Sequence, residues 1–149
     1  MDEEIKIRAM RKRDIPKVSQ IEKLSFSSPW SSNIFYLELE KESFALYRVL
    51  EYRDRLVGYG GYWRIKNEAH LVTFAIHPSF RKKGLGTRLL EYLLKDAQGK
   101  SLDTITLEVR HSNMVAQRFY ERFGFKKIAI RSHYYSDTNE DAIVYWKKL

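Results

Sequence analysis

The alternation of apolar and polar positions begins near the start of the chain and predicts a strand over residues 5–9. Apolar positions then recur every three or four residues. This spacing predicts a helix from Asp14, a suitable N-cap, to about residue 24, and a second helix from about residue 33 to 41. Residues 25–32 between them are expected to form a loop, whose aromatic side chains either contact a ligand or pack the helices onto a sheet.

From residue 44 the pattern changes to the twofold alternation of strands. Two strands are expected over residues 44–52 and 56–65, with residues 53–54 forming a hairpin turn between them. A third strand over residues 70–76 is expected to end before Pro78, because proline has no amide hydrogen to donate to a ladder.

The second half of the chain continues with helices and strands. The expected ranges are 84–98 and 113–123 for helices, and 104–109, 125–130 and 142–146 for strands. Gly124 is placed to cap the second of these helices in a left-handed conformation, and the polar residues 132–141 are expected to form the last loop. No repeat or linker interrupts the pattern, so residues 1–149 are predicted to form a single mixed α/β domain.

Composition narrows the class of protein. With 44% hydrophobic and 31% charged residues, a chain of 149 residues has the balance of a globular domain with a substantial core. No apolar run is long enough to span a bilayer, and the first residues lack the apolar segment of a secretion signal, so no membrane association is expected. The absence of cysteine excludes disulfides, thiolate metal sites and a cysteine nucleophile, and it is compatible with the cytoplasm.

The net charge of +8 admits two interpretations. A basic protein either binds nucleic acid or the ribosome, or holds a polyanionic cofactor. The basic residues are scattered, apart from small clusters at residues 11–13 and 81–83, and there is no long basic arm. This distribution argues against specific nucleic-acid binding.

The cluster at residues 81–83 lies in the stretch with the clearest chemical signal. It follows a predicted strand, precedes a predicted helix, and continues with Gly84 and Gly86. The first amides of a helix have no partner within it, and the helix dipole favours negative charge there. The turn lacks the spacing of a P-loop and the third glycine of a dinucleotide-binding fingerprint. It is predicted to bind a phosphate or pyrophosphate group, with a solvated basic turn as the alternative.

Longer motifs extend this prediction by resemblance. The stretch HPSFRKKGLGTRLLEYLL resembles the acetyl-CoA signature of the GNAT acetyltransferases. The stretch LEVRHSNMVAQRFYERFGF, residues 107–125, is similar to one branch of that family, the RimI-like and archaeal NatA-like N-terminal acetyltransferases. The segments SFSSPWS and HYYSDTNEDAIVYW are also similar to this branch. The resemblance therefore covers nearly the whole chain, and its second motif is more specific than the glycine turn.

The resemblance implies a fold and a co-substrate. The fold would be a single GNAT-type α/β domain, with about seven strands in a mixed, mostly antiparallel sheet and about four helices. The sheet would part between the strands that end at Ile76 and Val109, and acetyl-CoA would enter that gap as the acetyl donor, without a metal. The implied donor contacts are the backbone of Phe74, Ala75 and Ile76 for the pantetheine and acetyl carbonyl, Arg81, Lys82, Lys83, Gly84, Leu85, Gly86 and Thr87 for the pyrophosphate, and Asn113.

Acetyl transfer to an amine requires a neutral nitrogen, stabilisation of an oxyanion, and a proton for the departing thiolate. Glu108 lies on the polar face of its predicted strand, and Tyr120 lies on the apolar stripe of its predicted helix. From the residues alone, Glu108 could be only an exposed carboxylate and Tyr120 only a core residue. The resemblance makes Glu108 the general base and Tyr120 the general acid, with His70 as a second candidate base.

The resemblance also assigns acceptor contacts to two loops, through Phe26, Pro29 and Trp30 on the first and Tyr134 and Tyr135 on the last. The predicted function is acetylation of the N-terminal α-amine of proteins or nascent chains, a ribosomal protein among them, in the cytoplasm. One rival is a GNAT enzyme for lysine side chains or a small amine. The other is a basic module that binds RNA or the ribosome without catalysis. The preferred termini, any auxiliary subunit and the oligomeric state are not predicted.

Overall fold

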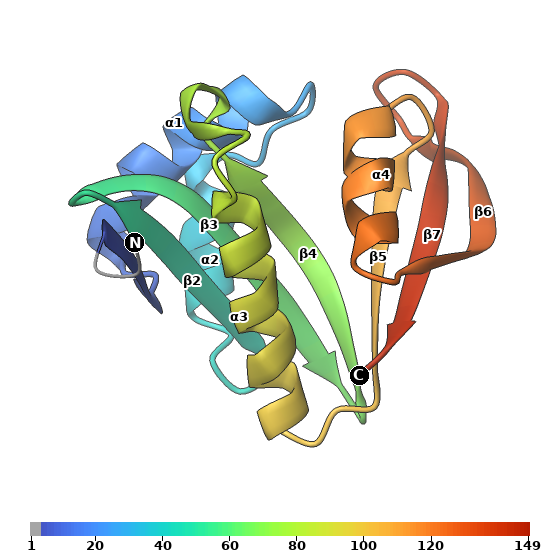
Figure 1. The fold of residues 1–149 in the computed structure, drawn as a ribbon. Helices are drawn as coiled ribbons and strands as arrows, with labels where there is room; N and C mark the ends of the chain where they lie inside the picture. The colour runs from blue at the N-terminus through green and yellow to red at the C-terminus, as the bar shows by residue number, and fades with distance from the viewer. Residues whose placement is uncertain (1–3) are drawn as a thin grey trace.

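The computed structural model describes residues 4–149, which form one sheet with α-helices on both of its faces (Figure 1). The helices are α1 (Ile15–Ser25), α2 (Ser32–Leu39), α3 (Leu85–Gly99) and α4 (Met114–Arg122). The strands are β1 (Ile5–Ala9), β2 (Ala45–Tyr52), β3 (Arg55–Ile65), β4 (Glu68–Ile76), β5 (Thr104–Arg110), β6 (Lys126–Tyr135) and β7 (Glu140–Lys148). None of the helices in the described part of the chain is long and apolar enough to cross a membrane.

The seven strands are ordered β1-β2-β3-β4-β5-β7-β6, and all neighbours are antiparallel except β4 and β5. The predicted mixed, mostly antiparallel sheet is therefore confirmed. The predicted hairpin between β2 and β3 is also confirmed. Its two turn residues, Arg53 and Asp54, have φ angles of 52° and 66°. A two-residue turn with two positive φ angles matches the right-handed twist of the strands that it joins.

Each face of the sheet has its own apolar core. On one face, α3 packs Leu90 and Leu93 against the sheet and α4 covers the strands beyond. On the other face, Val18 of α1 and Phe35 of α2 are fully buried in a second cluster. Figure 1 shows α3 and α4 in front of the sheet, and α1 and α2 behind it. The helices therefore cover the sheet from both sides and leave its ends open.

The parallel strands β4 and β5 pair over only three residues each, Glu68 to His70 with Thr104 to Thr106, and then part. Beyond this point β4 is bonded only to β3, and β5 only to β7. Figure 1 shows the two strands together at one end and apart at the other. The predicted parting of the sheet is confirmed, and it leaves two strand edges facing each other.

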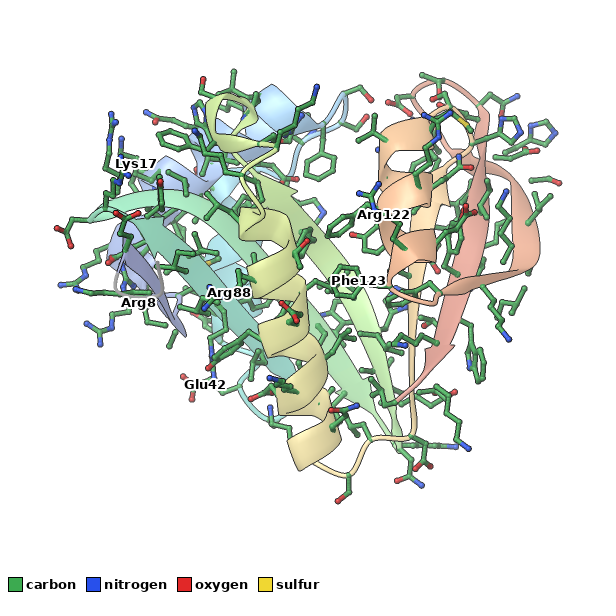
Figure 2. All side chains as sticks on the ribbon, viewed as in Figure 1. Arg8, Lys17, Glu42, Arg88, Arg122 and Phe123 are labelled. Atoms are coloured by element: carbon green, nitrogen blue, oxygen red, sulfur yellow. The ribbon has the colours of Figure 1, made fainter. Side chains whose placement is uncertain are left out.

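The apolar core continues from one half of the parted sheet to the other through α4. The rings of Phe74 in β4 and Phe119 in α4 have centroids 5.8 Å apart. Figure 2 shows Phe123 at the base of α4 on the side that faces β4, and this residue packs against the same core. These side-chain contacts connect the two halves of the sheet in the region where β4 and β5 are not paired.

Asp14 lies at the N-cap of α1 as predicted, but its side chain makes no capping hydrogen bond. Its carboxylate instead forms two hydrogen bonds with Arg8, at 2.8 and 2.9 Å, and accepts one from the amide of Arg11 at 2.8 Å. The reason is the short 3-10 turn over residues 12–14, which directs the side chain back toward β1. Asp14 therefore ties the first strand to the first helix.

The prediction of a last loop over residues 132–141 is wrong in its extent. Strand β6 continues to Tyr135 and β7 begins at Glu140, so only residues 136–139 connect them. Nearly every side chain of β6 is exposed, because it is the edge strand and two register shifts break its pairing with β7. A strand with no buried face has no apolar alternation to mark where it ends.

Candidate active site

A cavity of about 280 Å³ occupies the gap between β4 and β5. Two of its walls are the facing strand edges, residues 71–74 and 107–110. The other lining residues are Glu22, Phe26, Ser28, Trp30, Asn113, Ala116, Tyr120 and Tyr135. The parting of the sheet thus collects, in one place, side chains from both halves of the chain.

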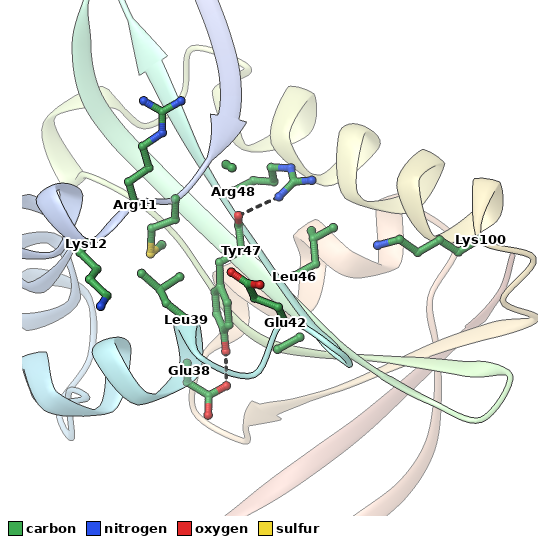
Figure 3. A pocket seen from close by; sticks show the side chains of 12 residues that line it. Arg11, Lys12, Glu38, Leu39, Glu42, Leu46, Tyr47, Arg48 and Lys100 are labelled. Carbon is green, nitrogen blue, oxygen red and sulfur yellow. Dashed lines mark hydrogen bonds between the residues drawn. The ribbon is translucent and has the colours of Figure 1, made fainter.

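A second and larger cavity, of about 460 Å³, lies beside β1, β2 and α2 (Figure 3). None of the predicted site residues lines it. Polar groups that line this cavity already form hydrogen bonds with other residues of the protein. Glu38 accepts hydrogen bonds from Tyr47 and Trp63, and Arg48 donates to the carbonyl of Tyr47 at 3.0 Å. The chemistry-bearing residues therefore belong to the smaller cavity.

Glu108 and His70 form a pair close to the point where the strands part. Nε2 of His70 lies 3.1 Å from Oε1 of Glu108, and Nδ1 lies 2.9 Å from the hydroxyl of Thr106. The parallel register explains this arrangement, because His70 is paired with Thr106 and Glu108 projects from the same strand face two residues later. Glu108 lines the cavity, and His70 reaches it through Glu108.

The pKa of Glu108 is set by two opposing influences. Burial raises it, whereas the hydrogen bond and charge of His70, with a contribution from Arg131, lower it further than burial raises it. The pKa is therefore held below its usual value. At neutral pH Glu108 is a carboxylate that faces the cavity.

Tyr120 reaches the cavity from α4. Its ring packs among Phe74, Phe119 and Phe125, and its side chain is 7% exposed. Its hydroxyl has no hydrogen-bond partner among residues 4–149, and no side-chain oxygen in that range is both sealed from solvent and unpartnered. The hydroxyl is therefore accessible from the cavity. Burial raises the pKa of Tyr120, so the phenol is protonated at neutral pH.

The residues predicted to contact the acceptor substrate divide into two groups. Phe26, Trp30 and Tyr135 line the cavity, whereas Pro29 and Tyr134 do not. Tyr134 is 46% exposed, and its ring stands perpendicular to that of Tyr135 with the centroids 5.0 Å apart. The loop before α2 and the end of β6 therefore both bring aromatic side chains to this cavity.

Glu22, which is not among the predicted site residues, also lines the cavity. It is 3% exposed, and its carboxylate accepts hydrogen bonds from the amide of Trp30 at 3.0 Å and from the hydroxyls of Tyr59 and Thr73. Burial raises its pKa against the effect of these three hydrogen bonds. Glu22 thus fixes the loop that carries Trp30 to strands β3 and β4.

Arg110 at the end of β5 is a second lining residue outside the predicted site. Its guanidinium lies 4.0 Å from the ring centroid of Tyr135 and forms an ion pair with Asp137. These contacts fix the end of β6 against the cavity wall.

The basic turn before α3 has the backbone of an anion site. None of the amides of residues 82–87 donates a hydrogen bond within the described part of the chain. Lys82 and Gly84 have positive φ angles of 63° and 79°, and Gly84 is the N-cap of α3. The lysine side chains of the turn are exposed. A phosphate group fits this turn, because unpaired amides and the start of a long helix both favour negative charge there.

Arg81 differs from the rest of the turn. Its guanidinium donates one hydrogen bond to the carbonyl of Ile76 at 3.0 Å and another to the hydroxyl of Ser25 at 3.3 Å. It therefore holds the turn against β4 and α1 and adds positive charge beside it.

The remaining predicted donor contacts lie on β4 and at the start of α4. Phe74 and Asn113 line the cavity, whereas Ala75 and Ile76 are buried further along the strand. Their predicted contacts are through the backbone, and this part of β4 is bonded only on its β3 side. An extended polar molecule in the gap would therefore find unpaired backbone groups along this edge.

The cavity combines three chemical capabilities. The Glu108–His70 pair can accept a proton, and the hydroxyl of Tyr120 can donate one. Unpaired backbone along the strand edge can bind an extended amide-containing molecule, and the basic turn can bind its phosphates.

Known proteins with similar sequences identify the family of this chain. Residues 15–125 match the acetyltransferase (GNAT) family. A Bacillus subtilis protein with the provisional name of a ribosomal protein bS18-alanine N-acetyltransferase is 39% identical over 140 residues, covering 94% of this chain and 93% of that protein. The ribosomal protein bS18-alanine N-acetyltransferase of Salmonella typhimurium is 34% identical over 133 residues, which cover 88% of each chain.

Two solved structures have a similar fold and a related sequence. The crystal structure of the ribosomal-protein-S18-alanine N-acetyltransferase from Escherichia coli superimposes with a TM-score of 0.88 at 30% identity, covering 97% of this chain and 93% of that one. The structure of Ard1 from Thermoplasma volcanium superimposes with a TM-score of 0.90 at 28% identity, covering 98% of each.

Proposed function

The chain belongs to the GNAT acetyltransferase family, and we propose that it transfers the acetyl group of acetyl-CoA to the N-terminal α-amine of a protein. The observation that carries the proposal is the presence of the Glu108–His70 pair and the Tyr120 hydroxyl at one cavity between parted strands. The relatives named as ribosomal protein bS18-alanine N-acetyltransferases support a ribosomal protein as the acceptor. The reaction would take place in the cytoplasm, within one domain that spans residues 1–149.

In this proposal Glu108 is the general base. An α-amine has a pKa of about 7.8, so roughly 10–15% of it is neutral at pH 7, compared with about 0.04% for a lysine side chain. Such an acceptor needs only modest assistance. The ionised Glu108 can take its proton directly or through one water, and His70 holds the carboxylate in place and shares the proton.

Tyr120 is the general acid. The acceptor nitrogen attacks the thioester carbonyl carbon, a tetrahedral oxyanion forms, and the carbon–sulfur bond then breaks. The phenol of Tyr120 gives its proton to the sulfur as it leaves and recovers one from water. The raised pKa of Tyr120 keeps the proton on the phenol until the thiolate develops. Transfer is direct, because the chain has no cysteine to carry the acetyl group.

The donor would lie along the gap with its phosphates at the turn before α3. The unpaired amides of residues 82–87 and the charges of Arg81, Lys82 and Lys83 support pyrophosphate binding there. The unpaired edge of β4 over residues 74–76 supports hydrogen bonding to the pantetheine. Asn113 contacts the donor from the start of α4.

The acceptor would enter between the two loops that carry aromatic side chains. Phe26, Trp30 and Tyr135 would contact the first residues of the peptide, with Pro29 and Tyr134 at the rim. A short cleft closed by aromatic side chains suits a chain terminus better than it suits the long side chain of an internal lysine.

The assignment of roles is tested by Glu108→Gln and Tyr120→Phe, which keep the shape of each side chain and remove its proton chemistry. We expect kcat on a peptide with a free N-terminus to fall about 10²- to 10⁴-fold in each variant. The affinity for acetyl-CoA, measured by calorimetry, should change little. Unchanged turnover in both variants would contradict the roles.

The class of acceptor is tested with matched peptides. We expect acetylation of peptides with a free N-terminus and none of the same peptides with a blocked N-terminus and a free lysine. Activity retained on the blocked lysine peptides would favour the rival GNAT function. Salt-sensitive RNA binding without acetyl-CoA binding would favour the non-catalytic module.

A further inference from the structure

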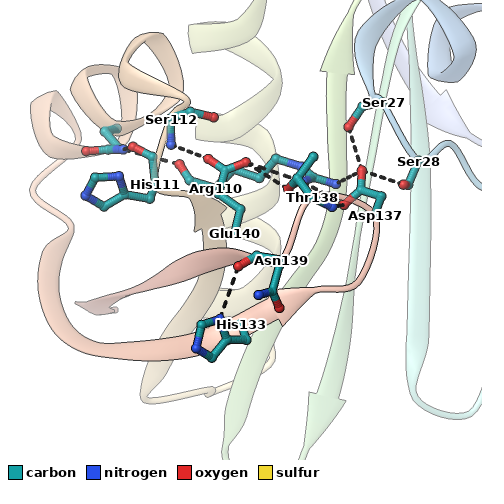
Figure 4. Close-up of polar contacts among 11 residues, drawn as sticks. Ser27, Ser28, Arg110, His111, Ser112, His133, Asp137, Thr138, Asn139 and Glu140 are labelled. Atoms are coloured by element: carbon teal, nitrogen blue, oxygen red, sulfur yellow. Dashed lines mark hydrogen bonds and ion pairs between the residues drawn. The ribbon is translucent and has the colours of Figure 1, made fainter.

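Asp137 connects two loops beside the cavity (Figure 4). Its Oδ2 accepts hydrogen bonds from the hydroxyls of Ser27 at 3.0 Å and Ser28 at 2.7 Å. Its two carboxylate oxygens also pair with the guanidinium of Arg110, at 3.0 and 2.9 Å. The serines lie between α1 and α2, Asp137 lies between β6 and β7, and Arg110 ends β5. One carboxylate thus joins three segments that are far apart in the sequence.

The β6–β7 side of this bridge is firmly anchored. Arg110 also lies 3.5 Å from Glu140 and 3.1 Å from the hydroxyl of Thr138. Glu140 in turn accepts a hydrogen bond from the amide of Ser112 at 2.6 Å. The β6–β7 loop is therefore fixed to the end of β5, and Asp137 extends from it to the loop before α2.

The bridge is the polar link between the two loops. Within residues 4–149, the hydrogen bonds that run from the α1–α2 loop to the β6–β7 loop both end on Asp137. These loops flank the cavity-lining aromatics, with Phe26 and Trp30 on one side and Tyr135 on the other. Ser28 and Arg110 themselves line the cavity. Asp137 is therefore the point at which the two loops are bonded directly to each other.

We propose that Asp137 is a positioning residue for the acceptor, which holds the two loops at the spacing that a peptide terminus needs. The inference rests on the proposed function. A peptide that enters between walls already held in place does not have to order them on binding. The bridge therefore acts on the peptide and leaves the donor and the proton-transfer groups unaffected.

The test is Asp137→Ala, which removes every oxygen of the bridge. Asp137→Asn is the conservative variant, because its amide oxygen can still accept from a serine. Asp54→Asn is the matched control. It removes one negative charge from an exposed turn, where the carboxylate's one ion pair within residues 4–149 is a 3.7 Å contact with Lys6. Each protein is assayed for KM and kcat with a free-N-terminus peptide, for acetyl-CoA affinity, and for amide hydrogen exchange over residues 26–31.

In Asp137→Ala we expect the peptide KM to rise about 5- to 20-fold, with kcat and acetyl-CoA affinity changed less than twofold. Amides of residues 26–31 should exchange faster. Asp137→Asn should give intermediate values, and Asp54→Asn should match the wild type.

Two results would overturn the inference. One is a peptide KM and an exchange pattern in Asp137→Ala that match those of Asp54→Asn. The other is a loss of acetyl-CoA affinity as large as the loss of peptide affinity. If the wild-type enzyme acetylates no free α-amine, the proposed function fails. Hydrogen exchange in Asp137→Ala then tests the bridge separately. Faster exchange over residues 26–31 supports the bridge, and unchanged exchange refutes it.

Discussion

Glu108 has a low pKa because of His70, a neighbour from another strand. Burial alone would raise the pKa of this carboxyl group, and the hydrogen bond and charge of His70 reverse that effect. The pair exists because β4 and β5 run parallel and are in register at residues 70 and 106. The pKa of Glu108 is therefore set by strand pairing as well as by residue type.

Removal of His70 should raise the pKa of Glu108. In His70→Ala the main lowering influence is lost, while burial and the smaller effect of Arg131 remain, so the pKa should move above that of the wild-type group. Because protonation of Glu108 then begins at higher pH, the acid limb of the kcat/KM profile should also shift to higher pH. A side-chain NMR titration of Glu108 measures the shift directly. His111→Ala, at an exposed position outside the cavity lining, is the control, and equal profiles in the two variants would disprove the coupling.

At the residue scale, periodicity placed Glu108 and Tyr120 on their elements, the resemblance to the GNAT family assigned them to the site, and both line the cavity. Glu108 stands on the polar face of an alternating strand, and Tyr120 stands on a helical stripe. Glu22 was missed, although its spacing from Ile15 and Val18 places a charged residue on a buried helix face. Its partners Tyr59 and Thr73 come from distant strands, so no local pattern reveals why the charge is tolerated. Asp137 lies in a polar loop with no periodicity at all.

At the scale of elements, the turn before α3 depends on backbone conformation. Gly84 has a φ of 79°, and a Cβ built there would meet nothing within 4 Å. A side chain at position 84 would therefore meet no steric clash, and its energetic cost would be the strain of the left-handed backbone conformation. Gly84→Ala should lower the free energy of unfolding by about 1–2 kcal/mol and weaken acetyl-CoA binding, because the turn amides would shift. Thermal unfolding and calorimetry measure the two effects.

Gly99 provides the matched control for this prediction. It is the last residue of the same helix, a Cβ there would also meet nothing within 4 Å, and its φ is not in the left-handed region. Gly99→Ala should therefore leave acetyl-CoA binding unchanged and be neutral or stabilising by up to about 1 kcal/mol. A loss of stability as large as that of Gly84→Ala would show that the turn conformation is not the cause.

The elements that the sequence predicted best are those with one buried face. Helix α3 and strand β5 both match their expected ranges within a residue or two, since each alternates between core and solvent. The predicted start of strand β6 agrees with the structure. Its predicted end lies five residues before the observed end, because the exposed side chains of this strand give no apolar pattern to follow.

At the scale of the whole molecule, the two halves of the sheet are joined by three residue pairs of β4 and β5 and by the apolar core under α3 and α4. A donor that binds in the gap contacts both halves, so it should stabilise the fold as a unit. At a free acetyl-CoA concentration of 100 times Kd, the stabilisation is about 2.7 kcal/mol, which should raise Tm by about 5–10 °C. Differential scanning fluorimetry measures this shift, and an unchanged Tm at saturating acetyl-CoA would rule out binding in the gap.

The parted strands also leave backbone edges that a folded protein has to cover. Unpaired strand edges are templates on which other chains assemble, and most proteins keep them short, charged or covered. Here β4 and β5 each have an unpaired edge in the interior, facing a cavity of about 280 Å³. In the proposed complex, acetyl-CoA lies between these edges and takes the place of a strand. The acetyl donor would then cover these edges in the way that a neighbouring strand covers them in other sheets.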